Sequence, residues 1–97
     1  MSQDPVLMII RVRAFAYFRE ILGNERYVEL KEGSDLGDLL KVISEERRAR
    51  DLLFDSSGNL RDHVVLMRNR RNVSSGSLAL ELKDGDEVAV FPPVAGG

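Results

Sequence analysis

Residues 35–43 read Asp-Leu-Gly-Asp-Leu-Leu-Lys-Val-Ile, a stretch flanked on both sides by strand-like sequence. Four of its five apolar side chains follow the i, i+3, i+4, i+7 spacing of one buried helix face: Leu36, Leu39, Leu40 and Ile43. Asp35 stands where an N-cap is expected, and Asp38 favours the positive end of a helix. The spacing predicts one main helix, with Glu45-Glu46-Arg47-Arg48 as its solvated end.

The flanking sequence predicts strands, turns and a second, shorter helix. Strands are expected at residues 7–13, 27–30, 64–67 and 87–91, with a further short strand around Val73. Phe15, Phe18 and Leu22 recur at helical spacing before Gly23, which is placed as a C-terminal stop. Turn or loop composition marks residues 32–33, 55–59, 69–72 and 84–86.

This order of elements predicts the fold class. Strand, short helix, strand, main helix and then strands favour a single α+β domain with a mixed four- to five-stranded sheet. The main helix is expected to pack on one face of that sheet, as in a β-grasp. We expect the β-grasp domain to span residues 1–91 and an exposed, flexible C-terminal tail to span residues 92–97.

Composition excludes several classes of function. The net charge of −2, from 14 basic and 16 acidic residues, argues against a general nucleic-acid binder. The chain has no cysteine and one histidine, His63, so neither a thiolate nucleophile nor a clustered metal site is expected. The apolar run at residues 6–10 is too short to cross a bilayer, and Asp4 does not suit a signal peptide. We expect a cytoplasmic, non-catalytic protein that binds no cofactor or metal of its own.

The most informative feature is the diglycine Gly96-Gly97, which we expect to be the C-terminus. Glycine has no Cβ, so this pair can thread a narrow channel towards a reactive centre. A free α-carboxyl is ionised near neutral pH and is a poor electrophile, because its pKa is about 3.3–3.7. Useful chemistry there requires activation by a partner, most simply as an acyl adenylate made from ATP. Pro92 and Pro93 favour an extended tail that reaches roughly 20 Å beyond Phe91.

Residues 83–97 read Lys-Asp-Gly-Asp-Glu-Val-Ala-Val-Phe-Pro-Pro-Val-Ala-Gly-Gly. This stretch resembles the C-terminal signature of the molybdopterin synthase small subunit and of related ubiquitin-like sulfur carriers, including small archaeal modifier proteins. Residues 15–23 and 32–40 resemble the first helix of that family and the approach to its main helix. Asn69-Arg70-Arg71 stands where the family often has an Asn-Gly turn. The resemblance implies the ubiquitin-like β-grasp fold.

The resemblance also implies a chemical cycle centred on Gly97. An E1-like enzyme adenylates the Gly97 carboxylate with ATP, and sulfur transfer converts it to a thiocarboxylate. The thiocarboxylate then donates sulfur to a pterin precursor in a complex with the large synthase subunit. Contact with these partners is expected from the tail and its root: Phe91, Pro92, Pro93, Val94, Ala95 and Gly96. The alternative is a protein modifier joined through Gly97 to lysines of target proteins, or a chain with both functions.

For several side chains, the sequence alone leaves two interpretations open. Phe91 could anchor a partner or close the edge of the core. The arginines of residues 47–50 and 68–71 are either solvated or a docking site for an acidic partner. His63 is expected at a strand edge without a catalytic role, and the carboxylates of residues 84–86 suit turn chemistry better than a metal site. A small interaction domain with an incidental tail is a third possible function.

Overall fold

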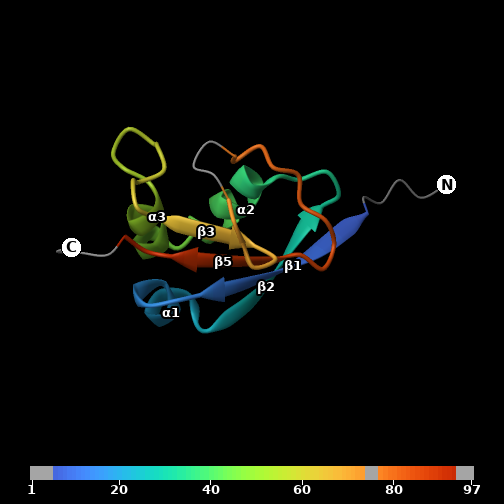
Figure 1. Cartoon of the computed structure of the whole chain (residues 1–97), viewed down its shortest axis with the longest axis horizontal. Helices are drawn as coiled ribbons and strands as arrows, with labels where there is room; N and C mark the ends of the chain where they lie inside the picture. Colours follow the sequence, from blue (N-terminus) through green and yellow to red (C-terminus); the bar gives the residue numbers. More distant parts are fainter. Residues whose placement is uncertain (1–5, 74–76, 94–97) are drawn as a thin grey trace.

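The computed structural model describes residues 6–73 and 77–93. The elements in chain order are β1 (Leu7–Ala14), α1 (Tyr17–Leu22), β2 (Glu25–Lys31), α2 (Leu36–Ile43), α3 (Arg47–Leu53), β3 (Val65–Arg68), β4 (Arg71–Asn72) and β5 (Glu87–Phe91). The strands form one mixed sheet in the order β2-β1-β5-β3-β4 (Figure 1). The parallel pair is β1 with β5, and the other neighbours are antiparallel. The predicted β-grasp with a mixed four- to five-stranded sheet is confirmed, and the sheet has five strands.

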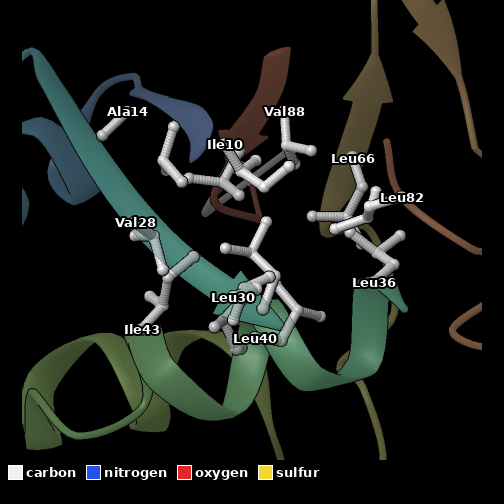
Figure 2. Packing of buried hydrophobic residues seen from close by; sticks show 14 of the residues in the cluster. Ile10, Ala14, Val28, Leu30, Leu36, Leu40, Ile43, Leu66, Leu82 and Val88 are labelled. Carbon is white, nitrogen blue, oxygen red and sulfur yellow. The ribbon is translucent and has the colours of Figure 1, made fainter. Parts of the chain in front are cut away.

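Helix α2 supplies the centre of the core. Four of its five apolar side chains, Leu36, Leu39, Leu40 and Ile43, are completely buried. They face inward-pointing side chains of the sheet such as Ile10, Val28 and Val88 (Figure 2). Each fully buried side chain of this size contributes roughly 1.5–3 kcal/mol relative to an exposed one. The predicted cap is also present, because Asp35 and Asp38 each accept a hydrogen bond from the other's backbone N–H.

The main helix ends earlier than predicted. The stretch Glu45-Glu46-Arg47-Arg48 was expected to continue it, but α2 stops at Ile43 and a separate helix, α3, begins at Arg47. The Glu46 carboxylate accepts a hydrogen bond from the Arg48 backbone N–H and so caps the new helix. Ala49 and Leu53 of α3 are completely buried, which explains why this charged segment folds back onto the core.

Two smaller predictions also needed correction. Phe15 was expected in the first helix, but α1 begins at Tyr17 and only Phe18 of the early aromatic pair is fully buried. The strand expected around Val73 is the two-residue β4, which ends at Asn72. The Val73 N–H still donates to the Leu66 carbonyl at 2.9 Å, so backbone pairing continues one residue beyond β4.

The turn before β5 is organised by one buried carboxylate. Asp86 is 7% exposed, accepts hydrogen bonds from the Lys83 backbone N–H at 2.8 Å and the Asn69 side-chain amide at 2.9 Å, and pairs with Arg68 at 3.1 Å. A buried charge is tolerated when it is paired and hydrogen-bonded in this way. Asp84 accepts the Ile9 N–H at 2.8 Å, which fixes the other side of the same turn. The interpretation of these aspartates as turn chemistry is confirmed.

Candidate functional site

Strand β5 ends at Phe91, where the predicted tail begins, and both of its neighbours hold it there. Phe91 is the last residue of β5 and pairs with Val65 of β3, while the Phe15 N–H donates to the Val90 carbonyl at 3.2 Å on the other side. Strand β5 is therefore fixed by both neighbours up to the residue before the tail. This end of β5 lies at the end of the molecule that carries α1 and α3 (Figure 1). We call Phe91, Pro92 and Pro93 the tail root.

An aromatic stack marks the tail root. The rings of Phe15 and Phe91 lie 4.4 Å apart, centroid to centroid, with 11° between their planes. The Arg13 guanidinium carbon lies 5.2 Å from the Phe15 ring centroid, within cation–π range. Phe15 and Phe91 are both half-buried, whereas Val65 beside them is 41% exposed. Phe91 therefore belongs to a partly open apolar surface on the sheet face opposite α2, and not to the buried core.

A recess borders the tail root at Pro93. It has a volume of about 520 Å³ and is lined by Pro93 and by residues of the loop between α3 and β3. Asp55 holds this loop by accepting the N–H groups of Ser57 and Asn59, and the Arg61 Nε donates to the Asp51 carbonyl at 2.7 Å. The loop is thus pre-shaped beside the residue from which the tail continues.

Next to the aromatic stack, the same face of the sheet carries an ion-pair network. Arg11 binds Glu25 at 2.8 Å and Glu87 at 3.2 Å, and Arg13 approaches Glu87 at 3.8 Å. The Tyr27 hydroxyl and then the Arg11 guanidinium hold the pKa of the Glu25 carboxyl below its usual value. These groups are solvent-accessible, so they shape the electrostatic surface more than they stabilise the fold.

The arginine clusters are partly used inside the fold. Arg68 pairs with the buried Asp86, which makes it a structural residue. On α3, Arg48 pairs with Glu46 at 3.2 Å and Arg50 approaches Asp51 at 3.8 Å. Arg70 and Arg71 are exposed at the β3–β4 hairpin. Arg48, Arg50 and Arg68 thus have intramolecular partners. Docking of an acidic partner on either arginine cluster stays a prediction.

The remaining sequence candidate, His63, lies in the loop between α3 and β3. His63 is exposed in the turn before β3 and adopts a positive φ of 69°. Within residues 6–73 and 77–93, no group of three or more His, Asp or Glu side chains is placed to hold a metal ion. No helix in this part of the chain is long and apolar enough to cross a membrane.

Comparison with known proteins identifies the chain. The profile of the ThiS family matches residues 12–97. The chain belongs to the ThiS family. It is 36% identical over 92 residues to small archaeal modifier protein 3 of Haloferax volcanii, covering 93% of this chain and all of that one. It is 37% identical over 91 residues to the molybdopterin synthase sulfur carrier subunit of Chlamydomonas reinhardtii, with the same coverages.

Solved structures agree with this assignment to the ThiS family. A Haloferax volcanii protein solved in solution superposes with a TM-score of 0.84 at 35% identity, covering 100% of this chain and 93% of that one. A chain from the complex of subunits 1 and 2 of the molybdopterin-converting factor of Helicobacter pylori superposes with a TM-score of 0.61 at 26% identity. The match covers 93% of this chain and 100% of that one. The ubiquitin-like fold and the family resemblance predicted from sequence are both confirmed.

The predicted site residues of this ThiS-family chain divide into two groups. Phe91, Pro92 and Pro93 form the tail root described above, on which Phe15 and the loop before β3 converge. The other predicted site residues lie outside the described residues: Val94, Ala95, Gly96 and Gly97.

Sequence reasoning missed Phe15 and Arg13 as neighbours of the tail root. The alternation of β1 carried a signal, because buried Val12 and Ala14 place Arg13 and Phe15 together on the opposite face. The stacking of Phe15 on Phe91 could not be read from that pattern, since it depends on the parallel pairing of β1 with β5.

Proposed function

We propose that this chain is a ubiquitin-like sulfur carrier for molybdopterin synthesis, whose reactive group is the α-carboxylate of Gly97. The observation that carries the proposal is the ThiS-family match, which runs through residue 97 and therefore includes the diglycine. The sulfur carrier subunit of Chlamydomonas reinhardtii, 37% identical along its whole length, supports the destination of the sulfur. In this proposal the chain itself is not an enzyme, and catalysis belongs to its partners.

The chemistry follows from the state of the carboxylate. An ionised carboxylate resists attack by nucleophiles, so one of its oxygens must first attack the α-phosphorus of ATP and release pyrophosphate. A sulfur nucleophile then attacks the carbonyl carbon of the acyl adenylate, and AMP leaves. Because the chain has no cysteine, the sulfur must come from outside it. An E1-like adenylating enzyme is the partner that these steps require. The large synthase subunit is the partner proposed for the following step, in which the thiocarboxylate donates its sulfur.

The surface around the tail root also supports the proposal, because it offers a place for partner proteins to dock. Partners that act on Gly97 must bind close to the base of the tail, where Phe15, Phe91 and Val65 present a partly open apolar surface. Buried aromatic side chains often dominate the energy of an interface. Phe91→Ala should therefore weaken binding to the activating enzyme by about tenfold or more, which corresponds to about 1.4 kcal/mol. Ile9→Ala, an exposed apolar residue towards the other end of β1, is the matched control and should bind normally.

Intact-mass spectrometry tests the reaction. The full chain is incubated with an E1-like enzyme, ATP and a sulfur donor, alongside a chain that lacks Gly96-Gly97. The full chain should gain the mass difference between one sulfur and one oxygen, and the truncated chain should keep its mass. An unchanged mass for the full chain, under conditions in which the enzyme thiolates another carrier, would refute the proposal.

The alternative is a protein modifier, favoured by the 36% identity to small archaeal modifier protein 3. The same acyl adenylate, or a thioester made from it, would be captured by a lysine amine of a target protein instead of by sulfur. Host proteins digested after expression of the chain should then carry Gly-Gly remnants on lysines. Conjugates without thiocarboxylate would favour the modifier, thiocarboxylate alone the carrier, and both products a dual role.

A further inference from the structure

The edge of the sheet formed by β2 takes no part in the proposed function. β2 is the outermost strand and pairs with β1 along its whole length. Within the described residues, nothing pairs with its other side. The tail root lies beyond β1, on β5, so the edge and the tail are separate surfaces. A long open strand edge offers unpaired N–H and C=O groups as a template for another strand.

The register shows which backbone groups are free. The Glu32 N–H donates to the Val6 carbonyl at 2.8 Å, and the Ala14 N–H donates to the Asn24 carbonyl at 3.2 Å. Even-numbered residues of β2 therefore bond to β1, because hydrogen-bonded pairs alternate along an antiparallel ladder. The backbone groups of the odd-numbered residues point to the open edge: Glu25, Tyr27, Glu29 and Lys31.

The side chains of these same residues lie on the face of the sheet opposite α2, where apolar groups are unusually exposed. Tyr27 is 64% exposed, and Leu7 and Ile9 of the neighbouring strand are 50% and 46% exposed. Ile9 lies opposite Glu29, so Tyr27 is its diagonal neighbour. The open edge is thus bordered by apolar side chains that are exposed to solvent.

We propose that β2 pairs with β2 of a second copy of this chain, antiparallel, about a two-fold axis at Val28. A symmetric dimer requires a self-complementary surface, and an antiparallel strand paired with its own copy satisfies this. All seven residues of β2 pair in only one register, in which Tyr27 faces Glu29 of the second copy and Glu25 faces Lys31 of the second copy. The two five-stranded sheets then form one continuous sheet.

The charges of β2 favour this register over the registers that are shifted by two residues. Full overlap places opposite charges at both ends of the ladder, because each Glu25 meets a Lys31. A shift of two residues one way sets Glu25 against Glu29 of the second copy. A shift of two the other way sets Glu29 against Glu29. Shifts by one residue are excluded, since they oppose a free backbone group to one already bonded to β1.

Apolar cover adds to the charge argument. In the full register Tyr27 of one copy is the diagonal neighbour of Tyr27 of the other, within reach of aromatic side chains. Each ring then lies between Ile9 of its own chain and the ring of the second copy. The association should be modest and salt-sensitive, because the charged groups stay near solvent and Glu25 also binds Arg11.

Sedimentation equilibrium of the full chain, from micromolar to millimolar concentration, tests the proposal. The chain should dimerise reversibly, and added salt should weaken the dimer. Lys31→Glu and Glu25→Lys should each weaken association about tenfold, because each places like charges at both ends of the ladder. Lys41→Glu changes the net charge equally on α2 and should dimerise as the parent chain does.

The most decisive experiment measures dimerisation in a mixture of the two charge variants. Lys31→Glu and Glu25→Lys chains repel their own copies but complement each other at both ends, so an equimolar mixture should dimerise about as well as the parent. Tyr27→Pro removes a free N–H without removing a bond to β1, and should abolish dimerisation while the chain stays folded. A monomer at all concentrations, or a mixture no stronger than either variant alone, would overturn the proposal.

Discussion

The β3–β4 hairpin contains a strained residue whose replacement should stabilise the protein. Arg68 pairs with Arg71 across a two-residue loop formed by Asn69 and Arg70. Both loop residues have positive φ, 49° and 71°, which is the type I′ turn that favours Asn-Gly. Asn tolerates this conformation and Arg does not, so we predict that Arg70→Gly increases the free energy of unfolding.

The size of the effect follows from two opposing contributions. A non-glycine residue in the left-handed region costs about 1–2 kcal/mol, and this strain disappears in the variant. Glycine loses about 0.5–1 kcal/mol more conformational entropy on folding than alanine does, which offsets part of the gain. The net stabilisation should be about 0.5–1 kcal/mol. For a domain of this size that corresponds to a rise in Tm of roughly 2–5 °C.

Thermal and urea unfolding followed by circular dichroism measure the change directly. Arg71→Gly is the matched control, because it removes the same side chain one residue later, within β4. Glycine in a strand lowers stability, so this variant should be less stable than the parent by about 0.5–1 kcal/mol. If Arg70→Gly were also destabilising, the assignment of a strained turn to Arg70 would be wrong.

Three further perturbations test other parts of the structure. Asp86→Ala removes the buried carboxylate that pairs with Arg68 and should lower the free energy of unfolding by about 2–3 kcal/mol in urea titrations; a loss under 0.5 kcal/mol would contradict its role as the centre of the turn. Phe18→Ala empties a fully buried site and should cost about 3–5 kcal/mol, measured in the same way. The pKa of Glu25 is lowered in the folded state by Tyr27 and Arg11, so its stabilising contribution is present above the usual glutamate pKa and is lost as pH falls through the lowered value. Glu25→Gln should therefore flatten the acid limb of the stability–pH profile, and an unchanged profile would argue against this ion pair.

The parts of the fold predicted correctly are those whose signal is local. The period of the apolar residues in α2 and the capping pair Asp35–Asp38 identified that helix, and the alternation of β5 gave its bounds. Helix α3 was missed because its sequence begins with Arg47-Arg48, which reads as a solvated helix end. Only burial against the rest of the fold turns Ala49 and Leu53 into core residues, and that is a tertiary effect.

In the candidate site, too, some features follow from local sequence and others depend on tertiary contacts. The chemistry proposed for Gly96-Gly97 could be formulated from residue types alone, because the properties of glycine and of the α-carboxylate expected there need no tertiary context. The surface around Phe91 could not. Its contact with Phe15 joins residues 76 positions apart, and the recess at Pro93 depends on the loop that follows α3.

The central claim is that a partner activates the Gly97 carboxylate with ATP. Exchange of labelled pyrophosphate into ATP, catalysed by an E1-like enzyme, reports this step before any sulfur is involved. The full chain should support exchange, and a chain without Gly96-Gly97 should support none although it folds normally. Equal exchange with both chains would place the activated group elsewhere and contradict the account.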